Sequence, residues 1–247
     1  MEVLKYAILI FAITHNFHVF AEKENENMAE SIVSDISSPF TTPARFILYG
    51  GVLANSLTYL NHTKEGHDQH ESFKDAPPLG EGLTVVGNVI GYGLLNVSYV
   101  AWASWYGLKY DNPKMLKNAE VMARASLYSS GATFLLKKSI SQKRPGFPDD
   151  DNSFPSGHAS FAFSFASVVT ARHGWFYGSG AHALAGFIAV SRVNDDFHYL
   201  HDILAGITIG AAFGWGVHYN MEKRNNTWFT LIPTPQKGMG IAVGWSF

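Results

Sequence analysis

The sequence predicts an all-α protein: a bundle of about six helices followed by a short C-terminal β-hairpin. Three observations support this. Six apolar segments separated by polar loops cover most of the chain after residue 44. Proline residues stand in the loops between these segments, where helix breakers are expected. After residue 226 the composition changes, because β-branched and aromatic residues flank a turn rich in Pro and Gly, as in a hairpin.

The six apolar segments differ in length and polarity. Two are long enough to cross a bilayer, and one of these, residues 83–108, has no charged residue. A third carries Glu120 and Arg124 and is amphipathic. Two short segments are rich in Gly, Ala and Ser, which suits close helix packing. In order, the segments cover roughly residues 45–60, 83–108, 116–137, 157–171, 179–191 and 199–220.

The N-terminal region is predicted to lie outside the bundle. Residues 1–21 combine Lys5, an apolar stretch and small residues before a cleavage point after Ala21, which is typical of a secretory signal peptide. The alternative is an uncleaved anchor helix. The remaining organisation is a polar linker or surface helix over 22–43, a helical domain over 44–225 and the hairpin tail over 226–247.

Composition excludes several classes of protein. A chain of 247 residues fits one domain, and a net charge of −2 argues against nucleic-acid binding. The absence of cysteine excludes disulfide scaffolds and thiolate chemistry. Charged residues make up 15% of the chain against about a quarter in soluble domains, yet the mean hydropathy is only +0.00. Composition therefore leaves open a soluble protein and a membrane protein.

Three clusters of polar residues carry the chemistry. The first contains Lys137 and Arg144, the second contains Ser156, Gly157 and His158, and the third contains Arg192, His198 and Asp202. Three cations near one point are unfavourable unless an anion neutralises them, and phosphate oxygens match a guanidinium group well. A helix that begins at Gly157 would add free backbone N–H groups for the same anion.

The two histidines differ in their partners. His198 and Asp202 are four residues apart, so they share one face of a helix and the carboxylate can orient the imidazole. The other ring nitrogen of His198 is then free to act as a nucleophile. His201 is a rival nucleophile, but Asp202 follows it directly, and adjacent residues do not face each other on a helix.

The chain order predicts that the three clusters meet. In an up–down bundle, the segments 116–137 and 179–191 end on the side where 157–171 and 199–220 begin. Each cluster stands at one of these ends. We therefore expect one site at one end of the bundle.

The motifs K-x6-RP, PSGH and SR-x5-H-x3-D, over Lys137–Asp202, resemble those of the type 2 phosphatidate phosphatase (PAP2) superfamily. The resemblance implies a phosphatase with His198 as phosphorylated nucleophile, His158 as general acid and Asp202 as the residue that orients His198. It also implies that Lys137, Arg144, Ser156, Gly157 and Arg192 bind the substrate phosphate. No metal or cofactor is implied, although the His-rich stretch 62–71 leaves a metal site as an alternative.

The resemblance leaves the substrate open. A bundle in the membrane would take a lipid phosphate or diphosphate, such as phosphatidate, phosphatidylglycerophosphate or an undecaprenyl diphosphate. A soluble periplasmic protein would act on small phosphomonoesters, and a vanadate-dependent haloperoxidase is a remote alternative. Basic residues at the end of the bundle opposite the site predict a site facing the periplasm or exterior. The sequence makes no prediction about oligomeric state.

Overall fold

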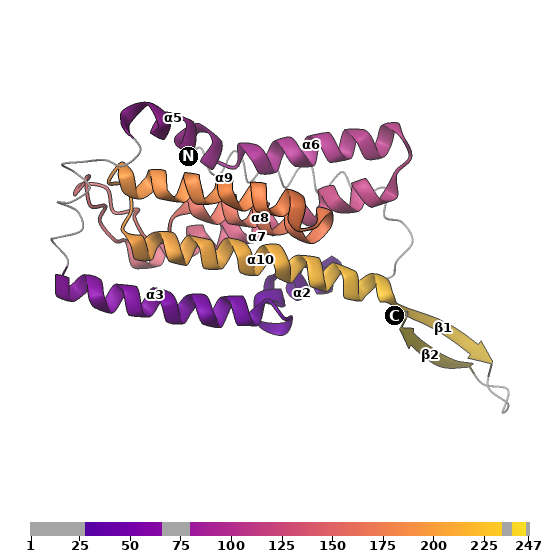
Figure 1. Cartoon of the computed structure of the whole chain (residues 1–247). Helices are drawn as coiled ribbons and strands as arrows, with labels where there is room; N and C mark the ends of the chain where they lie inside the picture. The colour runs from indigo at the N-terminus through magenta and orange to yellow at the C-terminus, as the bar shows by residue number, and fades with distance from the viewer. Residues whose placement is uncertain (1–27, 66–79, 234–238, 246–247) are drawn as a thin grey trace.

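The computed structural model describes residues 28–65, 80–233 and 239–245, and these residues form helices and one pair of strands (Figure 1). The prediction of an all-α main body is confirmed. The elements are α2 (Met28–Thr41), α3 (Arg45–Glu65), α5 (Gly80–Gly91), α6 (Leu94–Lys109), α7 (Pro113–Ile140), α8 (Gly157–His173), α9 (Trp175–Asn194), α10 (Leu200–Asn226), β1 (Thr227–Pro233) and β2 (Met239–Trp245).

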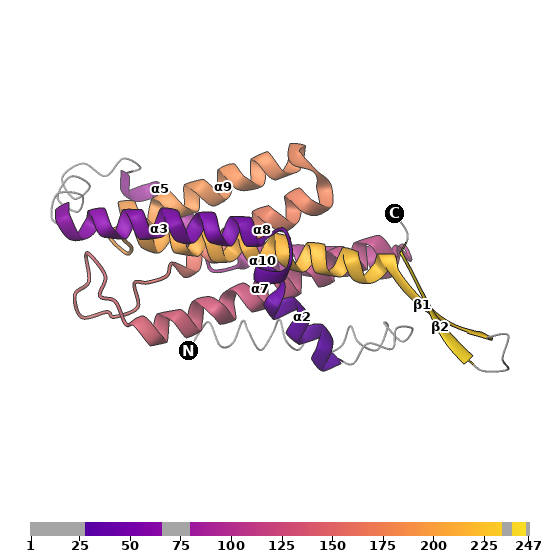
Figure 2. The ribbon, with the colours of Figure 1, turned by 90° about the horizontal axis from the view of Figure 1, so that it is seen from below.

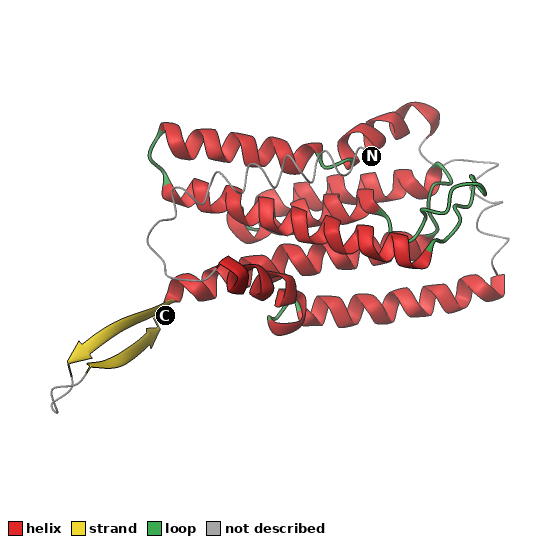
Figure 3. Cartoon of the chain, turned by 180° about the vertical axis from the view of Figure 1, so that it is seen from behind, coloured by secondary structure: helices red, strands yellow, loops and turns green. Residues whose placement is uncertain are grey.

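Helices α8 and α10 form the centre of the bundle. They pack against each other along their length, with α9 beside α8 and with α7 in contact with both (Figures 1 and 3). Helix α3 lies along α10, as Figure 2 shows, while α6 packs on α7 and α5 packs on α9. The strands β1 and β2 pair antiparallel, with Thr227 opposite Trp245, beyond the C-terminal end of α10.

Glycines allow the close approach of α8 and α10. Gly206, Gly210 and Gly214 recur every four residues along α10, and a Cβ atom on any of them would overlap atoms of α8. At Gly210 the obstructing atoms belong to the backbone of Ser160 and Ser164. Repeated small residues of this kind let two helix backbones pack directly against each other. The contact sets how the first turn of α10 lies relative to the first turn of α8.

Small side chains fill the interior of the described bundle, and many large ones lie outside. Alanine is the commonest buried apolar residue, and several serines of α7 and α8 are buried with it. Large apolar side chains such as Phe46 and Leu53 on α3, Leu135 on α7 and Phe176 on α9 are exposed. The protein therefore has an extensive apolar outer surface, which is uncommon in monomeric soluble proteins.

The described residues form eight helices rather than the six expected. Segment 83–108 is not one helix, because it breaks between α5 and α6 at Gly93, whose φ of +86° suits glycine but not other residues. Because residues on both sides of Gly93 are apolar, the sequence did not indicate this break. The other additional helix is α2, so residues 28–41 match the alternative of a surface helix rather than a linker.

A buried carboxylate attaches α2 to the bundle. Asp35 is fully buried and accepts hydrogen bonds from Arg124 on α7 (2.6 Å), Arg224 on α10 (3.0 Å) and Asn220 on α10 (2.6 Å). A buried carboxylate requires such compensation, because desolvation of an unpaired charge is costly. This cluster lies far along α10 from Asp202 in its first turn.

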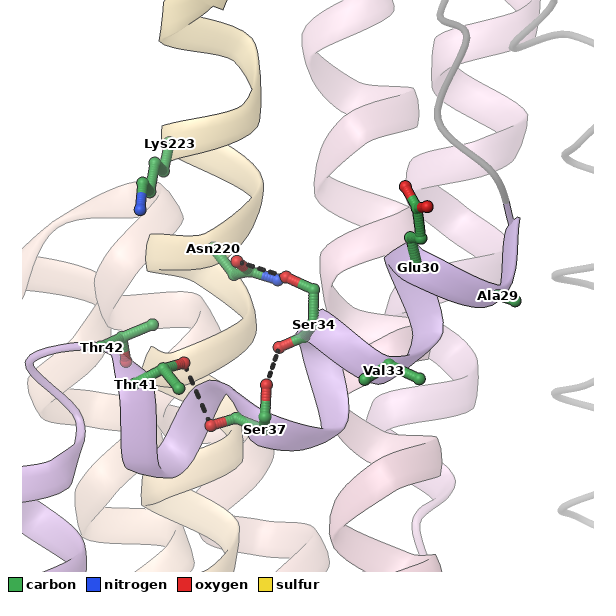
Figure 4. Close-up of a pocket in the computed structure, with 9 residues that line it drawn as sticks. All are labelled: Ala29, Glu30, Val33, Ser34, Ser37, Thr41, Thr42, Asn220 and Lys223. Atoms are coloured by element: carbon green, nitrogen blue, oxygen red, sulfur yellow. Dashed lines mark hydrogen bonds between the residues drawn. The ribbon is translucent and has the colours of Figure 1, made fainter.

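A pocket of about 550 Å³ lies beside this cluster, between α2 and α10 (Figure 4). Its hydroxyl groups are already used within the fold. Ser34 donates to Asn220, Ser37 donates to the carbonyl of Ser34, and Thr41 donates to the carbonyl of Ser37. None of the predicted phosphate-binding residues lines this pocket.

We expect Gly210→Ala to lower the free energy of unfolding by about 1–3 kcal/mol, because its methyl group overlaps backbone atoms that cannot rotate away. Gly131→Ala on α7 is the matched control, since no atom lies within 4 Å of its Cβ position. Alanine there should stabilise by about 0.5–1 kcal/mol through helix propensity. Denaturant unfolding measures both, and equal effects would contradict the close packing of α8 on α10.

Candidate active site

Four helix ends meet at one end of the bundle. Helix α7 ends there, a loop leads to the start of α8, and the end of α9 leads through a short turn to the start of α10. This end lies at the left in Figure 1 and at the right in Figure 3, where the loop is green. All eight predicted site residues lie on these helix ends or in the loop between them. The expected convergence of the three clusters is therefore what the structure shows.

Asp202, in the first turn of α10, is the most highly connected residue of the site. It is fully buried, and its Oδ2 accepts hydrogen bonds from the Ser153 hydroxyl (2.5 Å) and from the backbone N–H of Tyr199 (3.0 Å). The bond to Tyr199 caps α10, since the carboxylate returns to the residue just before the helix. The carbonyl of Asp202 also accepts the backbone N–H of Ser156, so one residue connects the starts of α8 and α10.

His198 precedes α10 and faces the same carboxylate. Its Nδ1 lies 3.5 Å from Oδ2 of Asp202, and the side chain is buried. Burial lowers the pKa of His198 to about 4, although Asp202 acts in the opposite direction. The imidazole is therefore neutral at neutral pH. With Nδ1 directed at the carboxylate, Nε2 is the ring nitrogen that does not face Asp202.

Helix α5 holds His158 in the first turn of α8. The backbone of Asn88 acts to raise the pKa of this imidazole, and the ring of Tyr92 lies 4.4 Å away, centroid to centroid. A Cβ atom at Gly91 would overlap the imidazole, so only glycine leaves room for it. Burial, together with the charges of Arg192 and His198, lowers the pKa of His158 to about 3.

The ring of Phe197 organises two of the predicted phosphate ligands. Arg192 lies over this ring with its guanidinium carbon 4.3 Å from the centroid, and Arg144 lies at 5.3 Å. Nε and Nη1 of Arg192 are buried without a hydrogen-bond partner among the described residues, and Asp195 lies 3.9 Å from Nη1. Buried donors of a charged group normally have acceptors. An anion at this point would provide them.

The other predicted phosphate ligands lie around the start of α8. Lys137 donates to the carbonyls of Asn152 (2.5 Å) and Ser153 (3.2 Å). Burial and the neighbouring Arg144 lower the pKa of Lys137 to about 8. Ser156 caps α8 by accepting the N–H of Ala159, and no atom lies within 4 Å of a Cβ position at Gly157. The first turn of α8 is therefore open to an approaching ligand.

The argument against contact between His201 and Asp202 is wrong. Nε2 of His201 lies 3.1 Å from Oδ1 of Asp202, and the ring is buried. Adjacent residues diverge in the middle of a helix, but this contact occurs in the first turn, beside a loop. Sequence reasoning also missed Ser153 and Phe197. Phe197 stands directly before His198, while no sequence signal identified Ser153.

Some predictions fall outside the described residues. They include the signal peptide or anchor over 1–21 and, for its side chains, the His-rich stretch 62–71. Among the residues that the structure describes, no group of three His, Cys, Asp or Glu side chains is arranged to hold a metal ion.

Comparison with known proteins finds similarity over the part of the chain that contains the predicted site residues. Residues 121–226 match the family model of the PAP2 superfamily. The chain is 33% identical over 67 residues to lipid A 1-phosphatase of Porphyromonas gingivalis. This alignment covers 26% of this chain and 15% of that protein. It is 27% identical over 165 residues to probable diacylglycerol pyrophosphate phosphatase 1 of Schizosaccharomyces pombe. This alignment covers 54% of this chain and 58% of that protein. The chain thus spans less than two thirds of either relative.

A solved structure shares the fold. The transmembrane PAP2-type phosphatidylglycerolphosphate phosphatase from Bacillus subtilis matches with a TM-score of 0.52 and 22% identity, over 72% of this chain and 97% of that one. The matched family region contains most of α7 and all of α8, α9 and α10, which are the helices whose ends form the site. Family model and motifs agree that residues 121–226 are similar to the PAP2 superfamily, and the fold is that of the solved PAP2-type structure.

Proposed function

We propose that this protein is a metal-independent phosphatase that hydrolyses phosphate esters of lipids through a phosphohistidine intermediate. The observation that carries the proposal is the convergence of Lys137, Arg144 and Arg192 with two histidines at one end of the bundle. Buried Nε and Nη1 of Arg192 have no hydrogen-bond partner among the described residues, which supports an anion between these cations. The names of the relatives, each a phosphatase acting on a phosphorylated lipid, support the substrate class.

The first step would be attack on phosphorus by the lone pair of Nε2 of His198. The ester P–O bond breaks, and its electron pair stays on the leaving oxygen, which takes a proton from His158. Water then attacks the phosphohistidine while His158 accepts a proton from it. The N–P bond breaks, its electrons return to His198, and inorganic phosphate leaves. Asp202 keeps Nδ1 of His198 oriented and stabilises the positive charge that develops on the ring.

The cations would do two things in this scheme. They neutralise the charge that builds up on the transferred phosphoryl group, which is the usual role of preorganised donors. They also hold the substrate, whose negative charge opposes the repulsion that lowers the pKa of His158. A bound phosphate therefore raises the pKa of His158 again. The general acid gains its proton when there is a leaving group to receive it.

A lipid substrate fits the outer surface. Large apolar side chains cover the outside of α3, α5 and α6, and a pocket of about 320 Å³ lined mostly by apolar residues lies beside Tyr92, which contacts His158. Among the described helices, residues Leu200–Arg224 are long and apolar enough to cross a membrane by length and composition. We therefore place the bundle in or at a membrane.

The charge distribution supports an outward-facing site. Lys117, Arg172 and Lys223 lie at the helix ends opposite the site, and Glu222 pairs with the first two of them. Basic residues favour the cytoplasmic side of membrane proteins. The site would then face the periplasm or exterior. A soluble periplasmic acid phosphatase is the second candidate, and vanadate-dependent peroxidase chemistry is the remote one.

We expect His198→Ala to abolish phosphate release, because the variant has no nucleophile, while thermal unfolding remains cooperative. Wild-type enzyme stopped during turnover of 32P-labelled substrate should carry acid-labile, base-stable phosphate on His198. Orthovanadate should inhibit competitively, and a chelator should not. Wild-type turnover by His198→Ala would reject the proposed nucleophile. Inhibition by the chelator would support a metal site in the His-rich stretch 62–71 instead.

The pKa of Lys137, lowered to about 8, predicts an alkaline limit to activity. Below this pKa the ammonium group is charged and helps to bind phosphate, and above it the charge is lost, so kcat/KM should fall as pH rises through about 8. Lys137→Arg should move this limb to higher pH, because arginine stays protonated. The pH profile of kcat/KM measures this, and an unmoved limb in Lys137→Arg would assign it to another group.

Fractionation and a substrate panel together distinguish the lipid and soluble candidates. We expect the protein in the membrane fraction, released by detergent but not by high salt. Its kcat/KM should be highest for phosphatidate, phosphatidylglycerophosphate or an isoprenoid diphosphate in mixed micelles. Recovery in the soluble fraction with a preference for p-nitrophenyl phosphate would support the acid phosphatase instead. Vanadate-dependent bromide oxidation without phosphatase activity would support the remote candidate.

A further inference from the structure

His201 is enclosed more completely than a surface histidine would be. Its ring stacks on Tyr199 at 5.4 Å with an interplanar angle of 8°, and Phe154 stacks at 6.1 Å. Tyr59 of α3 meets the ring edge-on at 5.2 Å. Asn55 of α3 donates to the backbone carbonyl of His201. Three separate parts of the chain therefore hold the imidazole in one orientation.

That orientation directs Nε2 of His201 at the catalytic carboxylate. Oδ1 of Asp202 lies 3.1 Å from this nitrogen, and the side-chain amide of Gln142 lies beside it, with the amide nitrogen at 2.9 Å and the amide oxygen at 3.3 Å. Gln142 belongs to the loop that carries Arg144, and its carbonyl accepts the backbone N–H of Ser153. His201 thus stands between the carboxylate and the loop that carries a predicted phosphate ligand.

The two oxygens of Asp202 have different neighbours. Oδ2 accepts from Ser153 and from the backbone of Tyr199, and it faces His198. On the Oδ1 side, His201 is the side chain in ion-pair distance among the described residues. A carboxylate held by one oxygen can still rotate about its Cβ–Cγ bond. A contact at the second oxygen removes that freedom and holds Oδ2 toward His198.

We propose that His201 is a positioning residue of this site: it shares the carboxylate of Asp202 with His198 and holds that carboxylate in the orientation that activates the nucleophile. The proposal rests on the proposed phosphatase function. It also gives α3, which lies outside the matched family region, a part in catalysis, because Asn55 and Tyr59 hold His201.

Two substitutions separate this role from simple packing. His201→Phe keeps a flat ring between Tyr199 and Phe154 but removes Nε2. His201→Gln loses the stacked ring but keeps an N–H at a similar reach. If His201 acts through Asp202, we expect His201→Phe to lower kcat by about 10–100-fold with KM within about twofold, and His201→Gln to retain kcat within about threefold. A packing role would give the reverse order, with Phe tolerated and Gln impaired. His218→Phe, far along the same helix, is the matched control and should leave kcat unchanged.

A double-mutant cycle tests whether the effect passes through Asp202. In an Asp202→Asn background, His201→Phe should lower kcat by less than about twofold further, because the carboxylate it positions has gone. Independent effects that multiply would overturn the proposal.

The same four proteins give a readout that needs no activity. The shifts in Tm of the two single variants should not add in the double variant, because the two side chains are in contact. If the wild-type protein hydrolyses no phosphate ester, the proposed function fails, and additive Tm shifts would separately overturn the shared carboxylate. Non-additive shifts in an inactive protein would retain the contact and reject only the catalytic role.

Discussion

The carboxylate of Asp202 is the contact on which the arrangement of the site depends. It caps α10 through Tyr199, holds the loop before α8 through Ser153, and faces both His198 and His201. A buried carboxylate must have such partners, since an uncompensated charge in the interior costs several kcal/mol. The contacts that stabilise the negative charge of Asp202 therefore also bring the proposed nucleophile and the loop before α8 together.

The packing of α8 on α10 determines where that carboxylate lies. Because Gly206, Gly210 and Gly214 bring the two backbones close together, the carbonyl of Asp202 reaches the N–H of Ser156 at the start of α8. The open first turn of α8 then stands beside the residues before α10. A larger side chain along this contact would separate the two helix starts, and with them the proposed anion-binding end of α8 from His198.

The basic residues of the site are held by neutral groups more than by acids. Arg192 packs on the ring of Phe197, and Lys137 is bound to backbone carbonyls. Of the three cations, Arg144 has a close carboxylate partner in Asp150, at 2.8 Å, which is itself partly exposed. Burial of Lys137 and His158, and to a lesser degree repulsion from the neighbouring cations, lower the pKa values of both groups. A dianionic ligand would offset the repulsion, so affinity for phosphate and protonation of the site are coupled.

The sequence alone determined the all-α class, the approximate positions of most helices and the end of the bundle at which the eight predicted site residues meet. Apolar segments and their prolines define helices and turns locally, and consecutive antiparallel helices must bring alternate ends together. The spacing of His198 and Asp202 is likewise a local property of one helical turn. Only the tertiary structure decided that Gly93 breaks the long apolar segment, that α2 docks through Asp35, and that Ser153, Phe197 and His201 join the site. These features arise from contacts between segments distant in sequence or across a helix end. Such contacts depend on how closely helices pack, and residue spacing does not encode that distance.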